Sequence, residues 1–483
     1  MSVRHGTWIG GLGLVASIAM ATSLAAQSGT AVLQNAQKAI GDIKSVQFSG
    51  TGMNAFFGQA LAAGQAWPRR DLTNVTGAVN YDQKSAKLEL VFKDAVFGGP
   101  RQNAEVNGDK AWTVGADGMA APQLANAEER QLQIWMSPHG FVRAALAAGN
   151  ATVKPATDNG QKVNVVSFTA MNKFRLNGTI TSDGLVTKVD TRFPNPVLGD
   201  MPYSFTYSDY KDFGGMKFPT NIVQAEGGFS VNEFTITSVQ PNAAVDLPVP
   251  ANVQSATVPA VVAQSQKIGD GVWFVGGGTH HSVVVEFNNF ITVIEGPLGE
   301  DRSKAVIAEA KKLAPNKPIR YVVSTHHHFD HSGGLRTYVA EGAIVVTHAS
   351  NVPYWQKTFA APATLVPDEQ STAKRKPTIQ PVTDKYVITD GTQSIEIYST
   401  MGDGHSDELL IVYIPSAKVL VEADSFSPGP PNAPVPNPVP PNAIVLYNNL
   451  DRLHLTDKIA TVVGIHGRGP VPMDEFKKFV GKS

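Results

Sequence analysis

The 483-residue sequence contains no cysteine. Disulfide bonds are therefore excluded, and a metal ion would find no thiolate ligand, so any metal site must be built from His, Asp or Glu. The sequence also lacks an excess of charge of either sign, with 40 Lys and Arg residues against 41 Asp and Glu residues. Because neutralising a phosphate backbone requires a basic excess, nucleic acid is not an expected partner.

Long apolar runs are equally scarce, and the one that stands out lies near the N-terminus. A run from Trp8 to Met20 follows Arg4 and precedes the small residues of "ATSLAAQ". Its length is within the range of a secretory signal and below the roughly 20 residues that cross a bilayer. We therefore expect a signal peptide over residues 1–26, a periplasmic or secreted protein, and no membrane span after cleavage. A short N-terminal membrane anchor is the alternative.

The next part of the chain, residues 27–240, has the alternation and frequent turns of antiparallel strands. "AEVNGDKAWTV" predicts a hairpin at Asn107-Gly108, and "RLNGTITSDGLVTKVDTRF" predicts another at Asp183-Gly184, with the helical stretch "ERQLQIWMSPHGFVRAALAAG" between them. This order resembles the curved antiparallel sheet of periplasmic lipoprotein carriers and related lipid-binding domains. The resemblance concerns the fold and names no ligand.

The remainder of the chain is organised differently. Residues 241–263 gain proline and lose the alternation, which is typical of a semi-rigid linker. Residues 264–483 alternate strand-like runs such as "IRYVVS" with helical segments such as "EDRSKAVIAEAKKLA", so we expect an α/β domain with layered sheets. Within it, the proline-dense segment from Pro428 to Pro441 predicts an extended loop, which is either a lid over the site or a peripheral insertion.

The histidines gather in this second half. Ten of the twelve lie between His280 and His466, and four of them occur in "THHHFDHSGG", directly after the predicted strand "IRYVV". Because an extended chain points alternate residues the same way, His326, His328 and Asp330 are expected to converge. Imidazole nitrogen and carboxylate oxygen are both zinc ligands, so the motif predicts a metal site.

Zinc normally takes four ligands, so further ligands must come from elsewhere in the chain. His331 begins the turn that the following glycines permit and can approach from another direction. His405, Asp424 and His466 each lie beside an apolar strand, as the first cluster does. This pattern predicts ligands gathered at one edge of a layered sheet, with two metal positions about 3.5–4 Å apart.

The motif "THHHFDHSGG", followed in order by His405, Asp424 and His466, resembles the metallo-β-lactamase fold of metallo-hydrolases over essentially all of residues 264–483. The resemblance implies an αββα sandwich with a dinuclear metal site, normally two Zn²⁺, at one edge. One ion would be held by three histidines, the other by an aspartate and two histidines, and a second aspartate would bridge them. The three histidines are His326, His328 and His405. The ligands of the other ion are Asp330, His331 and His466, and the bridging aspartate is Asp424.

The sequence departs from the family's pattern at two positions. Glu295 in "ITVIEGP" stands where the family's first motif usually has Asp, and we expect it to anchor a ligand from behind. Asp424 stands where the cysteine-containing β-lactamases have a thiolate, so the sequence is more similar to glyoxalase-II-like thioesterases and acyl-homoserine lactonases. The implied activity is hydrolysis of an ester, thioester, lactone or amide by hydroxide formed at the metals, with Asp330 both a ligand and the catalytic residue that orients the nucleophile.

Several assignments stay open at the level of sequence. We expect His327 to point away from the metals. His280 and His281, in "GGGTHHS", are either residues of a loop that lines the cleft, with His281 as the substrate contact, or ordinary loop residues. Arg468 is either an anion contact or a surface arginine. The substrate is expected to be a small molecule, acylated or apolar in part, but neither its identity nor the oligomeric state follows. The alternative functions are an iron-dependent oxidoreductase of the same fold, with iron or mixed metals, a β-lactam hydrolase, and a non-catalytic acyl- or lipid-binding protein.

Overall fold

The computed structural model describes residues 29–94 and 99–482, and the predicted signal peptide lies outside these ranges. The chain forms two compact units. The first unit contains the residues up to Ala55, Arg69–Phe193 and Pro202–Val258. The second unit contains Pro259–Ser483 and also two short segments of the preceding sequence, Phe56–Pro68 and Pro194–Met201. Among the described residues, no helix combines the length and the apolar character needed to cross a membrane.

The first unit is built on one antiparallel sheet of 13 strands, in the order β6-β5-β4-β3-β2-β1-β13-β12-β11-β10-β9-β8-β7. All neighbouring strands in this sheet are therefore consecutive in the sequence, except β1 and β13. The strands are β1 (Ser45–Ala55), β2 (Arg69–Asn80), β3 (Ser85–Phe92), β4 (Arg101–Asn107), β5 (Lys110–Val114), β6 (Ala120–Pro122), β7 (Thr152–Asp158), β8 (Gln161–Ala170), β9 (Phe174–Thr181), β10 (Val186–Asn195), β11 (Gly199–Asp212), β12 (Lys217–Glu226) and β13 (Phe229–Pro241).

Helices cover one face of this sheet because the chain between β6 and β7 is helical. After a 3-10 turn at Leu124–Asn126, α2 (Ala127–Met136) and α3 (Pro138–Ala148) follow each other, separated only by Ser137, whose hydroxyl caps α3. Apolar side chains of α2 pack with strand residues in one buried cluster. A cavity of about 370 Å³ lies beside it, lined largely by apolar side chains of the strands and by polar residues of α2 such as Glu129 and Gln133.

The second unit contains two sheets. The first has seven strands in the order β14 to β20, namely β14 (Gln264–Gly269), β15 (Val272–Gly276), β16 (Ser282–Glu286), β17 (Ile291–Ile294), β18 (Ile319–Val323), β19 (Ile344–His348) and β20 (Thr378–Val382). The second has six strands in the order β21 to β26, namely β21 (Lys385–Thr389), β22 (Ser394–Ser399), β23 (Leu410–Ile414), β24 (Val419–Glu422), β25 (Thr461–Gly464) and β26 (Pro470–Pro472).

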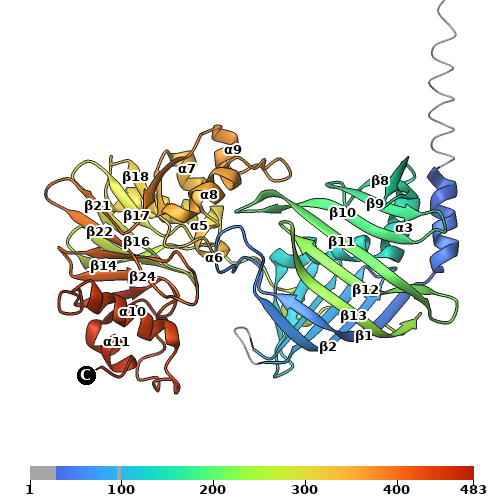
Figure 1. The fold of residues 1–483 in the computed structure, drawn as a ribbon, viewed down its shortest axis with the longest axis horizontal. Helices are drawn as coiled ribbons and strands as arrows, with labels where there is room; N and C mark the ends of the chain where they lie inside the picture. Colours follow the sequence, from blue (N-terminus) through green and yellow to red (C-terminus); the bar gives the residue numbers. More distant parts are fainter. Residues whose placement is uncertain (1–28, 95–98, 483) are drawn as a thin grey trace, which may run out of the picture. The chain divides into compact units, whose positions relative to one another are not determined.

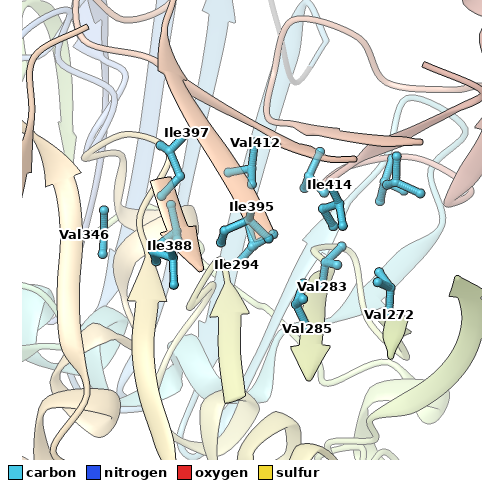
Figure 2. Close-up of a cluster of buried hydrophobic side chains, with 14 of the residues drawn as sticks. Val272, Val283, Val285, Ile294, Val346, Ile388, Ile395, Ile397, Val412 and Ile414 are labelled. Atoms are coloured by element: carbon cyan, nitrogen blue, oxygen red, sulfur yellow. The ribbon is translucent and has the colours of Figure 1, made fainter. Parts of the chain in front are cut away.

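The two sheets face each other across a dry interior. The central strands are predominantly apolar and buried at every position, β23 being "LIVYI" and β24 "VLVE", which is the pattern of strands buried on both faces. Figure 2 shows the shared cluster, in which Val283 and Ile294 of one sheet lie with Ile395 and Ile414 of the other. The opposite faces of the strands must therefore be covered by helices.

Helices cover both outer faces (Figure 1). On the first sheet, α5, α7 and α8 bury residues such as Val306, Leu335 and Trp355 against β15 to β19. On the second sheet, α10 and α11 bury residues such as Leu446 and Phe476. The helices are α5 (Glu300–Leu313), α6 (Phe329–Ser332), α7 (Leu335–Glu341), α8 (Val352–Phe359), α9 (Glu369–Ala373), α10 (Pro441–Arg452) and α11 (Met473–Phe479), with a 3-10 turn at Ala349–Asn351. The predicted fold class, an αββα sandwich preceded by a mostly antiparallel β domain, is confirmed.

The connecting segments contain little regular structure. The predicted linker 241–263 contains the single helical turn α4 (Ala251–Gln254), and the two units divide after Val258. The predicted extended loop from Pro428 runs without helix or strand to Pro441, where α10 begins, and residues 429–438 are exposed.

Candidate metal centre

The "THHHFDHSGG" motif lies where β18 passes into two short helices. β18 ends at Val323, the chain stays irregular through His328, and α6 begins at Phe329. The two glycines that follow allow α7 to start at once, because the structure leaves no room for a side chain there. A Cβ on Gly333 would lie 2.1 Å from the Leu298 carbonyl oxygen, and one on Gly334 would lie 1.8 Å from the Ser303 hydroxyl.

Eight side chains meet at this end of the two sheets and offer two groups of ligand atoms. Six come from loops at strand ends, and Asp330 and His331 come from the short helix α6, so no strand residue contributes a ligand atom. In each group, the ligand atoms lie within 4.8 Å of one another. The groups are His326, His328, His405 and Asp424, and His280, Asp330, His331 and His466.

Asp424 lies between the two groups. Its Oδ2 is 3.1 Å from His326 Nε2 and 3.0 Å from His405 Nε2 in its own group, and 2.8 Å from His331 Nε2 in the other. Its Oδ1 is 2.7 Å from His466 Nε2. One carboxylate therefore reaches both groups, which is the geometry required of a bridging ligand.

The turn after β24 holds Asp424 in this place. Asp424 adopts a left-handed backbone conformation, with φ of 64°, which aspartate tolerates better than most residues. The fully buried Glu422 accepts hydrogen bonds from the backbone N–H groups of Ser425 and Phe426, each at 3.1 Å. The Ser425 hydroxyl donates to Asp403, whose other oxygen accepts from the His405 backbone at 2.8 Å, so the loops of Asp424 and His405 are joined.

Four of the histidines have the ring nitrogen that points away from the centre engaged by another group. For His326 and His280, this nitrogen is Nδ1, which contacts the hydroxyl of the preceding threonine, at 3.0 and 2.9 Å. His331 Nδ1 lies 2.8 Å from the Glu295 carboxylate, and His328 Nε2 donates to the Ala60 carbonyl at 2.9 Å. Metal-binding histidines are characteristically oriented by such partners, so the arrangement suits metal ligands.

Burial favours the neutral, metal-binding form of two of these imidazoles. Burial, followed by the neighbouring His331, lowers the pKa of His326 to about 3. Burial likewise lowers the pKa of His328, with His326 and His405 adding to the effect. His328 Nδ1 is buried and has no hydrogen-bond partner among the described residues. A buried ring nitrogen without a partner is costly unless it binds something, so this atom fits a metal ion.

The two aspartates, in contrast, favour their charged form. Burial by itself would raise the pKa of Asp424, but His331, His326 and His405 outweigh it and hold that pKa well below its usual value. For Asp330, burial is outweighed by the hydrogen bond from His280 and by His331, and the pKa is lowered. Both groups are thus ionised at neutral pH, as metal ligands must be.

The centre is partly exposed to solvent. The side chains of His326 and His331 are 0% exposed, whereas that of Asp330 is 33% exposed and that of His405 is 24% exposed. Solvent, and hence a substrate, can reach the centre past Asp330 and His405.

The structure brings together all seven residues predicted as metal ligands, and it places the other predicted residues around them. Glu295 lies behind His331. His281 donates from Nε2 to the Gly467 carbonyl at 2.8 Å, and Arg468 donates to the Gly429 carbonyl at 2.6 Å and pairs with Glu475. The predicted substrate contacts of His281 and Arg468 stay predictions. His327 belongs to neither group and pairs with the buried Glu408.

Sequence reasoning did not assign His280 and two residues of the first half, Gln59 and Ala60, to the centre. His280 is a member of the second group, with Nε2 3.1 Å from Asp330 Oδ2. The signal for His280 was the "GGGTHHS" loop, which was predicted to contact substrate and not to supply a metal ligand. Gln59 and Ala60 lie in a stretch without any recognisable motif, so their hydrogen bonds to Asp330 and His328 had no sequence signal.

Comparison with known proteins gives one family match. Residues 275–466 match the model of the metallo-beta-lactamase superfamily. No curated protein matched the chain. Similar solved structures include metallo-beta-lactamases from Pontibacter korlensis (19% identity, 45% of this chain and 97% of that chain, TM-score 0.33) and Hirschia baltica (17%, 46% and 97%, 0.34). Another is FIM-1 from Pseudomonas aeruginosa in its mono-zinc form (16%, 46% and 96%, 0.34).

The matched range contains every member of the two ligand groups, from His280 to His466. It also contains most strands of both sheets and the helices that cover them except α11. Residues 275–466 of this chain therefore form a domain of the metallo-beta-lactamase superfamily.

Proposed function

We propose that this protein is a dinuclear zinc hydrolase that cleaves an ester, thioester, lactone or amide. The position of Asp424, with its carboxylate in contact with both ligand groups, carries the proposal. Two groups of imidazole and carboxylate ligands that share one aspartate suit two ions of a metal that accepts nitrogen and oxygen equally, as zinc does. When bound, such ions supply Lewis acidity and water whose pKa is lowered to about 7.

The chain's own residues would hold and orient the reacting groups. His326, His328 and His405 would bind one ion, and Asp330, His331, His466 and His280 would surround the other, with Asp424 shared. Asp330 is the ligand most accessible to solvent, and one of its oxygens lies beside His280 and His331 while the other accepts from Gln59. An ionised carboxylate in that position can orient the attacking water and accept its proton.

The test is metal content and activity measured together. Protein purified without added metal or chelator is expected to contain two zinc ions per chain and to hydrolyse some members of a panel of esters, thioesters, lactones and β-lactams. Asp424→Ala removes the shared ligand, so it should lose at least one ion and most of the activity. Asp451→Ala, which removes an exposed carboxylate of α10, should match the wild type in both measurements.

The outcomes separate the alternatives. About one iron per chain would move the assignment to oxidation chemistry, and rapid nitrocefin hydrolysis without esterase activity would favour a β-lactam hydrolase. Full metal content and activity in Asp424→Ala would overturn the bridging role.

The location and the substrate class are part of the same proposal. The apolar run that follows Arg4 supports export, after which the cleaved protein would act in the periplasm or the medium. The largely apolar cavity of the first unit supports a small-molecule substrate with an acyl or other apolar part. Detection of the intact, uncleaved chain in the cytoplasm would overturn the location.

A further inference from the structure

The geometry points to a further segment that supports the metal centre, Phe56–Pro68. This segment connects β1 to β2 in the first half of the sequence, but it belongs to the second unit. We infer that this β1–β2 segment orients ligands of both ions and that Gln59 is a positioning residue for Asp330. The inference rests on the proposed dinuclear centre and adds to it residues that lie more than 200 positions before the "THHHFDHSGG" motif.

The first contact determines which nitrogen of His328 is free. The Ala60 carbonyl oxygen lies 2.9 Å from His328 Nε2, and Ala60 is completely buried. A carbonyl oxygen can only accept a hydrogen bond, so Nε2 must hold the proton. His328 Nδ1 is then left with its lone pair directed into the first ligand group, where it has no other partner among the described residues.

The second contact divides the two oxygens of Asp330 between two tasks. Gln59 Nε2 donates to Asp330 Oδ1 at 2.8 Å. Asp330 Oδ2 faces the second ligand group, 3.1 Å from His280 Nε2 and 3.8 Å from His331 Nε2. Because the amide of Gln59 fixes one oxygen, the carboxylate cannot rotate freely, and the other oxygen stays directed at the second group.

The segment is anchored on both sides of these two contacts. Phe329, the first residue of α6, donates its backbone N–H to the Gly58 carbonyl at 3.2 Å, and Asp407, two residues after His405, donates to the Leu61 carbonyl at 3.0 Å. The ring of Phe329 also packs edge-on against Phe57 and Trp67, with centroids 5.3 and 5.4 Å apart. The β1–β2 segment therefore contacts the two loops that carry His328, Asp330 and His405.

The fit leaves no space at Gly58. Gly58 has φ of 81°, a conformation that L side chains rarely adopt, and a Cβ there would lie 2.9 Å from the ring of Phe329. A substitution at Gly58 should therefore displace the whole contact, whereas one at Gln59 removes a single hydrogen bond. The pair of positions separates the packing of the segment from its polar role.

The experiment measures zinc affinity by chelator competition in the full chain, and visible spectra after replacement of zinc by Co²⁺. Gln59→Ala should weaken the affinity for one ion about 10- to 100-fold, the usual cost of losing a ligand's supporting partner, and change the Co²⁺ spectrum of that ion alone. Gln59→Glu has nearly the same shape but places a carboxylate beside Asp330, so its loss should be larger. Gln65→Ala removes an exposed side chain of the same segment and should behave as the wild type.

The outcomes distinguish this inference from the proposed function. Two ions in the wild type with unchanged affinities and spectra in Gln59→Ala and Gln59→Glu would overturn the inference and leave the dinuclear centre standing. No metal in the wild type, even when zinc is added, would overturn both. Gly58→Ala should weaken both ions; if this variant does not fold, the two Gln59 variants alone decide.

Discussion

At the scale of single residues, the centre depends on which nitrogen of each histidine faces inward. The outward nitrogens contact the Ala60 carbonyl, the Glu295 carboxylate and the hydroxyls of Thr279 and Thr325. None of these partners is a His or Asp residue of the "THHHFDHSGG" motif. His280 shows the consequence most clearly, because Thr279 engages its Nδ1 and thereby directs Nε2 at Asp330. A residue outside the motif therefore joins the second ligand group.

His280→Ala should consequently affect one ion only. We expect the zinc affinity of the second group to fall about 10-fold or more, whether His280 binds the ion or only orients Asp330, while the first group keeps its ion. His454→Ala is the control, since His454 is an exposed histidine that belongs to neither group. Chelator competition on both variants measures the effect, and equal metal retention in the two would contradict the role of His280.

At the scale of elements, the tight passage from α6 to α7 fixes the position of Asp330. The Leu298 backbone N–H donates to the Asp330 carbonyl at 2.7 Å, and the Leu298 carbonyl lies against Gly333. α6 has only four residues, so its position is determined by these contacts and not by its own hydrogen bonds. The α6–α7 turn is thus held by close backbone contacts, and these contacts can be tested without changing a ligand.

Gly333→Ala tests the contacts of the α6–α7 turn. The added methyl group meets a backbone oxygen, so the free energy of unfolding should fall by about 1–3 kcal/mol, as for other over-packed sites, and zinc affinity should fall with it. Gly299→Ala is the control, because a Cβ there would meet nothing within 4 Å. Urea unfolding of the metal-free variants gives the comparison. Equal free energies of unfolding would show that the α6–α7 turn accommodates the methyl group without loss of stability.

At the scale of the whole molecule, the sequence predicted what depends on local pattern. The alternation of strand-like and helical runs predicted a layered α/β domain. The αββα sandwich and the seven candidate ligands followed from the resemblance that the motif, with His405, Asp424 and His466, bears to the metallo-β-lactamase fold. The same reasoning divided the chain at one linker. It could not predict that Phe56–Pro68 joins the second unit, because that association depends largely on hydrogen bonds accepted by backbone carbonyls, which every residue carries.

The first unit contributes its own pH dependence to the stability of the chain. His139 in α3 is buried, donates from Nε2 to the Ile40 carbonyl at 3.1 Å, and stacks on Phe218. Burial is the main cause that lowers the pKa of His139 to about 4; the Ile40 hydrogen bond and Asp42 oppose it, while Arg143 adds to it. The unfolded chain, with a pKa near 6.5, therefore takes up this proton first as the pH falls.

The sign of the effect follows from that order. Above pH 6.5 neither the folded nor the unfolded state binds the proton, so His139 contributes nothing to the pH dependence. As the pH falls from 6.5 to 4, the free energy of unfolding decreases by up to about 3 kcal/mol. His139→Gln removes the titration, so the difference in unfolding free energy between pH 7 and pH 4 should be smaller in the variant by about that amount. Urea unfolding of the metal-free proteins at both pH values measures it, and an identical pH dependence in variant and wild type would show that His139 becomes protonated without opening the first unit.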